Sequence, residues 1–164
     1  MPDPAAPSSR AAAAADCELC RQPGGLLVAE TPLWRVVRVD DADFPAFYRL
    51  IWQAHVAEFS DLDAEARAAC MTAVAAIERA LRDALAPTKI NLATLGNMVP
   101  HLHWHVIARW DWDSHFPQPI WGVRQREVPG GARARLALAP EQLDARVREA
   151  LAALQPPASA APRP

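Results

Sequence analysis

The chain has 164 residues and a mass of 17.9 kDa, which is the size of a single domain. Its 17 lysines and arginines nearly balance its 19 aspartates and glutamates, so the net charge of -2 gives no electrostatic reason to expect a nucleic-acid polymer as partner. No stretch approaches the roughly 20 apolar residues of a membrane span, and no secretory signal is recognisable. Three cysteines do not make a disulfide scaffold. These features predict a soluble, cytoplasmic globular protein with no membrane partner.

Both ends of the chain are rich in proline, alanine and serine. Segments of this composition bury too little apolar surface to offset the entropy lost on ordering. We therefore predict disordered tails over residues 1–15 and 155–164, and one folded domain over residues 16–154.

The first half of that domain combines strands with a helix. Short apolar or aromatic runs predict strands over 26–29, 34–39 and 47–52, joined as a meander, although a helical turn also fits the third run. A long helix follows, with Asp63 as the expected N-cap, an apolar stripe at spacings of three and four, and Pro87 at its end.

The second half supplies two more strands, over 90–95 and 99–110, and a last helix that starts around Pro140 and carries an apolar stripe up to residue 154. The stretch between them, from 111 to 131, has no clean period. The order of these elements predicts an α+β fold in which an antiparallel sheet of about five strands packs with one long helix and a C-terminal helix.

Three of the five histidines occupy alternate positions, at His101, His103 and His105. Alternate side chains of a strand share a face, so the three imidazoles point one way and the intervening Leu102 and Trp104 point into the core. Chance placement on a half-buried strand, a metal site and nucleophilic catalysis are the three interpretations of this pattern. A single ion bound by all three is unfavourable, because the first and third positions lie roughly 13 Å apart along a strand.

Cys17 and Cys20 form a Cys-x-x-Cys pair, which serves redox chemistry, binds a metal or consists of two ordinary cysteines. A thioredoxin-type redox site is disfavoured, because it belongs between a strand and a helix of a βαβ unit and none is predicted here. Cys70 lies on the apolar stripe of the long helix and is predicted to be a core residue.

The segment from Gly96 to Arg109 resembles the signature of the histidine triad (HIT) family, in which His-φ-His-φ-His-φ-φ, with φ apolar, follows a Gly-Gln/Asn segment. The order of predicted elements over residues 16–115 is similar as well. The resemblance implies a HIT-like fold, a homodimer, and a nucleotide hydrolase or nucleotidyl transferase of the small bacterial type. Its expected substrates carry the α-phosphate of adenosine-type nucleotides, as diadenosine polyphosphates and adenylate phosphoramidates do. No catalytic metal is expected, because acidic residues do not cluster near the histidines.

The resemblance also assigns catalytic roles to the histidines. His103 matches the family nucleophile, which forms a nucleotidyl-histidine intermediate that water then opens. His105 would contact the phosphate or the leaving group, and His101 would support the nucleophile. Arg109 follows the triad and is expected either near phosphate or in a salt bridge.

Nucleotide binding is assigned in the same way. Asn97 matches a position that contacts phosphate oxygens, and Asn91 belongs to the same preceding segment. Asp40 or Asp41 lies where the family often has an acid that binds the ribose hydroxyls.

Some bacterial members of the family bind zinc through a Cys-x-x-Cys pair, a histidine after the meander and the first histidine of the triad. The resemblance therefore implies a structural zinc held by Cys17, Cys20, His55 and His101, a closed tetrahedral set of two thiolates and two imidazoles. Two ordinary cysteines remain the competing interpretation.

Two departures from the family pattern bear on activity. Phe47 stands where the family often has a fourth histidine that supports the nucleophile, and the loop between 91 and 101 is shorter than the usual glycine-rich version. They leave open an alternative function, a nucleotide-binding sensor or partner-binding protein with little turnover.

Overall fold

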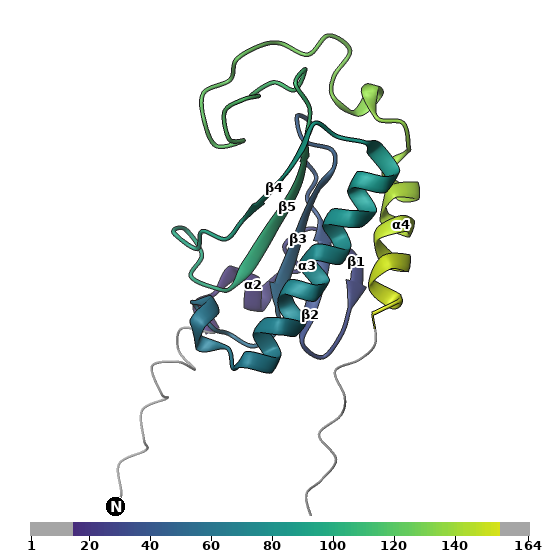
Figure 1. Ribbon diagram of the computed structural model, residues 1–164. Coiled ribbons are helices and arrows are strands. Elements are labelled where there is room, and N and C mark those ends of the chain that lie inside the picture. Colours follow the sequence, from purple (N-terminus) through teal and green to yellow (C-terminus); the bar gives the residue numbers. More distant parts are fainter. Residues whose placement is uncertain (1–14, 155–164) are drawn as a thin grey trace, which may run out of the picture.

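The computed structural model describes residues 15–154 and contains one five-stranded antiparallel sheet with helices packed on it (Figure 1). The strand order is β1-β2-β3-β5-β4, and every neighbouring pair is antiparallel. The strands are β1 (Leu26–Glu30), β2 (Trp34–Arg38), β3 (Phe47–Trp52), β4 (Lys89–Ala93) and β5 (His103–Arg109). The predicted α+β fold is confirmed. The tails expected to be disordered lie outside the described residues, except for residue 15.

The long helix forms where its end signals predict. Helix α3 (Ala64–Leu85) is capped by Asp63, whose carboxylate accepts a hydrogen bond from the backbone N–H of Ala66 at 2.8 Å. Ala86 takes a left-handed conformation directly after it, and Pro87 prevents its continuation. Helix α4 (Pro140–Ala152) closes the fold, and the one-turn helix α2 (Glu18–Arg21) opens it. None of the helices in the described part of the chain is long and apolar enough to cross a membrane.

The histidine strand is shorter than predicted, because β5 begins at His103 and not at residue 99. The chain bends at 97–99 after Gly96, whose φ of +76° lies in the left-handed region that glycine adopts without strain. Leu102 is held by the backbone of Val56 and Trp52, at 2.7 and 3.0 Å. His101 therefore precedes the strand and is not part of it.

The two faces of the sheet are covered differently. Helices α3 and α4 pack together against one face and enclose the main core, which includes Tyr48, Leu50 and Val106 (Figure 1). The opposite face carries the alternate residues of the same strands. Two small apolar clusters lie there, one around Cys17 and Ile51 and the other around Phe44, Phe47 and Ile107. The predicted separation of the histidines from the core residues between them is confirmed for β5.

Candidate functional site

His103 and His105 lie side by side on the face of the sheet opposite helices α3 and α4, with their ring centroids 4.8 Å apart. Strand pairing sets them opposite β3, where Ile51 faces His103 and Arg49 faces His105. Both imidazoles are buried, with 8% and 4% of their surface exposed. We call these two residues the histidine pair.

The backbone fixes the tautomer of His103. Its Nδ1–H donates a hydrogen bond of 2.6 Å to the carbonyl oxygen of His101, because a carbonyl can only accept. Burial lowers the pKa of His103, so the ring is neutral near pH 7. Its Nε2 therefore carries a free lone pair, which is what a nucleophilic imidazole requires.

His105 is enclosed by rings. Phe47, His103 and Trp121 lie 5.4, 4.8 and 5.1 Å from its centroid. Burial, followed by electrostatic repulsion from the neighbouring His103 and Arg49 when the ring is protonated, lowers its pKa to about 3, so this ring too is neutral near pH 7. Its Nδ1 is buried and has no hydrogen-bond partner among residues 15–154. A buried polar atom without a partner is unfavourable in the free protein and is a common property of atoms that meet a ligand.

Four metal-ligating side chains meet at the N-terminal end of β5. One ligand atom from each of Cys17, Cys20, His55 and His101 lies within 4.8 Å of all the others, and we call this group the Cys/His cluster. The Nδ1 of His101 is 3.4 Å from both sulfurs, and the Nδ1 of His55 is 3.4 Å from the sulfur of Cys20. Helix α2 supplies the local geometry, since its single turn brings Cys17 and Cys20 to the same side.

The cluster fits zinc by two tests. Tetrahedral zinc with ordinary bond lengths sets sulfur and nitrogen ligands about 3.6 Å apart, close to the separations found here. The Nε2–H of His101 donates to the backbone oxygen of Trp52 at 2.6 Å, which leaves the lone pair on Nδ1, the atom that faces the sulfurs. The ring of His101 thus belongs to this cluster, and its contact with His103 runs through its backbone oxygen.

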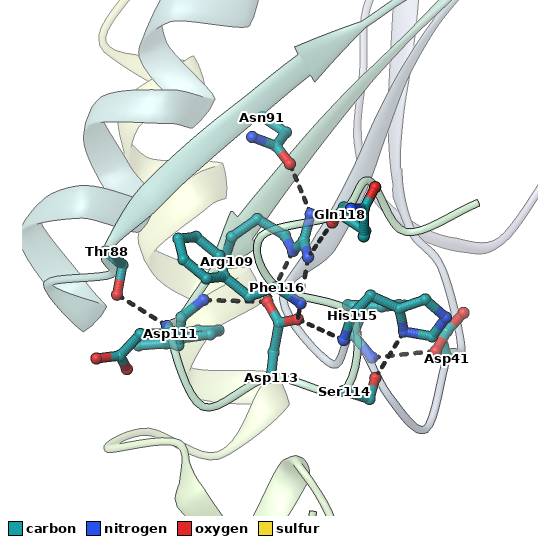
Figure 2. A network of polar contacts seen from close by, with 12 residues as sticks. Asp41, Thr88, Asn91, Arg109, Asp111, Asp113, Ser114, His115, Phe116 and Gln118 are labelled. Carbon is teal, nitrogen blue, oxygen red and sulfur yellow. Dashed lines mark hydrogen bonds and ion pairs between the residues drawn. The ribbon is translucent and has the colours of Figure 1, made fainter. Parts of the chain in front are cut away.

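Arg109 holds the segment after β5 against the sheet (Figure 2). Its guanidinium is buried and donates to both carboxylate oxygens of Asp113 at 2.7 and 3.0 Å, to the side-chain oxygen of Asn91 at 2.7 Å and to the backbone oxygen of Gln118 at 2.9 Å. Of the two expectations for Arg109, the salt bridge is the one observed. This network fixes the start of the segment that brings Trp121 over His105.

Asp113 is the acceptor at the centre of that network. Besides Arg109, it accepts hydrogen bonds from the backbone amides of His115 and Phe116 at 2.9 and 2.7 Å (Figure 2). Burial alone would raise the pKa of Asp113, but the hydrogen bonds from Arg109 and the amides outweigh it and hold the pKa below its usual value.

A cavity of about 560 Å³ lies beside the histidine pair, between β4 and the segment 117–121. Asn91, Ala93, Ile107 and Trp121 are among the residues that line it. Neither histidine of the pair lines the cavity, which is connected to His105 through Ala93, its partner across the strands, and through Trp121, whose ring contacts it.

The structure separates the three predicted nucleotide-binding residues. Asn91 lines the cavity and is held by Arg109. Asn97 is exposed in the bend before His101. Asp40 is exposed and forms an ion pair of 3.3 Å with Arg133, while Asp41 accepts hydrogen bonds from the amides of its own turn.

A family model described as the HIT domain matches residues 23–111, which is more than half of the chain. The chain belongs to the histidine triad family. A histidine triad protein of Bradyrhizobium japonicum is 31% identical, with 79% of this chain and 92% of that one aligned at a TM-score of 0.63. A histidine triad protein of Sinorhizobium meliloti is 28% identical, with 79% of this chain and 91% of that one aligned at a TM-score of 0.62.

A more distant histidine triad family protein of Mycobacterium smegmatis, described as Zn-bound, shares the fold at 19% identity, over 85% of this chain and 95% of that one, with a TM-score of 0.55. Comparison with curated proteins gives no significant match.

Within this HIT protein, the triad is divided between two sites. The ring of the first histidine faces the Cys/His cluster, and the second and third form the histidine pair. Sequence reasoning missed one neighbour of the pair, Arg49. The signal for Arg49 was available, because it is the single charged residue in the otherwise apolar run 47–52.

Proposed function

We propose that this HIT protein is a nucleotide hydrolase or nucleotidyl transferase that acts at the α-phosphate of adenosine-type nucleotides, with His103 as the nucleophile. The observation that carries the proposal is the hydrogen bond from the Nδ1–H of His103 to the backbone oxygen of His101, which leaves a neutral imidazole with its lone pair on Nε2.

The proposed reaction has two displacements at phosphorus. The Nε2 lone pair of His103 attacks the α-phosphorus, a P–N bond forms, and the bond to the leaving group breaks. Water then attacks the phosphorus of the nucleotidyl-histidine, the P–N bond breaks, and the pair of electrons returns to Nε2. A nucleoside monophosphate and a proton are released. His105, whose ring lies 4.8 Å from that of His103, would contact the phosphate or the leaving group as a neutral hydrogen-bonding ring, and the leaving group takes its proton from solvent.

The cavity beside His105 supports a nucleotide as the substrate. Its volume of about 560 Å³ is in the range of pockets that hold small molecules. Trp121 offers an aromatic surface against which a purine ring can stack, and Asn91 offers a side-chain amide at the same wall. Adenine is part of this proposal and not of the family assignment.

We further propose that the Cys/His cluster holds one structural zinc ion. Two thiolates and two imidazoles complete a tetrahedral set, and the zinc-bound relative of the same fold is consistent with such a site. The ion would tie the N-terminal segment to the residue that precedes β5. The chemistry it supplies is structural, and no step of the reaction passes through it.

A homodimer completes the proposal. Strand β4 is an edge strand that pairs only with β5, and Leu92 on it is exposed, so it offers an edge and an apolar side chain for contact with a second copy. Sedimentation at micromolar concentration tests it, and a stable species near the monomer mass of 17.9 kDa contradicts it.

Trapping the intermediate tests the function. Wild-type protein is mixed with substrates labelled at the α-phosphate, drawn from dinucleoside polyphosphates and nucleoside phosphoramidates with adenine, guanine or uracil bases. We expect turnover of at least one adenine substrate and an acid-labile label on His103, located by mass spectrometry of alkaline digests. Tight nucleotide binding without turnover across the panel would instead favour the sensor alternative. If the protein neither binds nor turns over any nucleotide of the panel, both the enzyme function and the sensor function are refuted.

A further inference from the structure

Arg49 is placed next to the reacting histidines. It lies in the middle of β3, where the strand register sets its Cα opposite that of His105. Paired residues of antiparallel strands project to the same face, so Arg49 and the histidine pair share the face opposite α3 and α4. Phe47 and Ile51, two positions away on either side, belong to the two small apolar clusters of that face. Arg49 and the histidine pair therefore occupy the polar gap between these clusters.

The guanidinium of Arg49 has few protein partners. It lies 5.3 Å from the centre of the Phe47 ring, and its Nη1 donates to the backbone oxygen of Gly24 at 3.4 Å, the outer limit of a hydrogen bond. Its Nε is buried and has no hydrogen-bond partner, and no carboxylate among residues 15–154 forms an ion pair with it. A guanidinium has five N–H donors, so most of those of Arg49 are unused by the protein.

Neighbouring arginines show what a structural role requires. Arg35 donates to three backbone oxygens and to Gln53, and Arg38 is paired with Asp144. Arg109 has its carboxylate partner Asp113 at 2.7 Å. Arg49 differs from all three, since burial lowers its pKa and only the more distant charge of Glu18 opposes that effect. A partly buried cation without a counterion is unfavourable in the free protein, and an anionic ligand would remove that penalty.

We propose that Arg49 binds the phosphate oxygens of the nucleotide at the phosphorus that His103 attacks. This inference rests on the proposed function and adds to it a residue that contacts the substrate. Negative charge collects on the equatorial oxygens during transfer, and a guanidinium can donate two parallel hydrogen bonds to them. The positive charge of Arg49 and its N–H donors would thus stabilise the phosphate during transfer. Arg49 forms no covalent bond and transfers no proton.

Arg49→Met tests the proposal, because methionine keeps an unbranched side chain and removes the charge and the donors. We expect the variant to bind AMP on the order of 10- to 100-fold more weakly by calorimetry, as for loss of hydrogen bonds to a charged group, and to bind adenosine as the wild type does. Arg49→Lys should restore part of the AMP affinity. Arg148→Met is the matched control, since Arg148 donates to Val28 from α4 on the other face, and its AMP affinity should not change.

Thermal unfolding separates ligand binding from a structural role. Removing an uncompensated charge should leave the melting temperature of Arg49→Met unchanged or higher, whereas a structural arginine would lower it. Equal AMP affinity in wild type and Arg49→Met overturns the proposal, and so does a loss of adenosine affinity equal to the loss of AMP affinity. If Arg49→Met does not fold, the proposal fails on that ground, because Arg49 is then structural.

Inorganic phosphate distinguishes this failure from failure of the proposed function. If the wild type turns over no nucleotide, phosphate is titrated into wild type and Arg49→Met and followed by NMR. Phosphate binding that the substitution weakens at least tenfold supports the anion site even though the reaction is wrong. Equal binding, or none by the wild type, refutes the anion site itself.

Discussion

The Cys/His cluster and the histidine pair use imidazole side chains in opposite ways, although His101 of the cluster lies within five residues of both histidines of the pair. In the cluster, His101 and His55 face two sulfurs, and every ligand atom has neighbours of a metal-binding type. In the pair, His103 and His105 face each other, aromatic rings and an arginine, and the Nδ1 of His105 has no partner in the described chain. Ligands that complete each other form a closed site, and imidazoles with unused nitrogens form an open one. Stability and reactivity should therefore separate along this short segment.

The largest separation is expected from His103→Ala. Loss of a covalent nucleophile should lower kcat by several powers of ten. The melting temperature should change little, because the ring lies on the face of the sheet opposite α3 and α4, away from the main apolar core. Steady-state kinetics with the best substrate of the panel and a thermal melt measure both. Near-normal kcat would exclude covalent catalysis by this residue.

Asn97→Ala tests whether the bend at 97–99 contributes to the reaction at the histidine pair or to metal binding at the Cys/His cluster. If Asn97 donates to phosphate, kcat should fall on the order of 10- to 1,000-fold, as for loss of one oxyanion donor, with no loss of metal. Asn97 is exposed in the free protein, so the substitution should not lower stability by more than about 0.5 kcal/mol. Unchanged kinetics would remove Asn97 from the site.

Loss of the metal should give the reverse pattern. In the Cys17→Ser/Cys20→Ser double variant, or after chelation, we expect the melting temperature to fall on the order of 10 °C, because metal binding contributes to folding free energy. The kcat measured well below that temperature should stay within about twofold, since the proposed zinc ion is structural and has no part in the proposed reaction. Elemental analysis of untagged protein should give one zinc per chain in the wild type, and less than a tenth of an equivalent would refute the site.

The pH dependence of stability isolates the histidine pair from the cluster. The pKa of His105 is lowered from 6.5 to about 3, so between these values the unfolded chain binds a proton that the folded chain does not. Stability should therefore fall as the pH drops below about 6.5, with a contribution from His105 of up to about 1.4 kcal/mol per pH unit.

His105→Gln should remove this contribution, and denaturant unfolding at pH 7 and pH 5 measures it as a difference from the wild type. Metal loss at low pH acts on both proteins and cancels in that difference. His115→Gln is the control, because His115 lies outside the pair, in the loop after β5. Equal slopes in wild type and His105→Gln would mean that His105 is not held neutral.

Much of the fold followed from local patterns. The alternation from Leu102 to Val106 predicted a strand with its histidines on one side, and Asp63 with Pro87 bracketed the long helix to within two residues. The start of β5 was predicted four residues too early, because an alternating pattern continues through His101 while the backbone does not. Two backbone hydrogen bonds with residues distant in sequence decide where Leu102 lies: its N–H donates to Val56, and its carbonyl oxygen accepts from Trp52.

The candidate site was also predictable in part, because some of its features depend on local sequence patterns. The chain's own residues, through their spacing and the family pattern, determined the histidine face, the triad and the four members of the Cys/His cluster. Only the tertiary structure decided between the two roles that the family pattern gave His101, by turning its ring toward the cysteines, and paired Arg109 with Asp113. It also set Arg49 opposite His105, with no carboxylate partner among residues 15–154. The alternation of residues along one strand determines which side chains share a face. The hydrogen-bond or ion-pair partner of a side chain depends on which strand and loop pack beside it, and the local sequence does not contain that information.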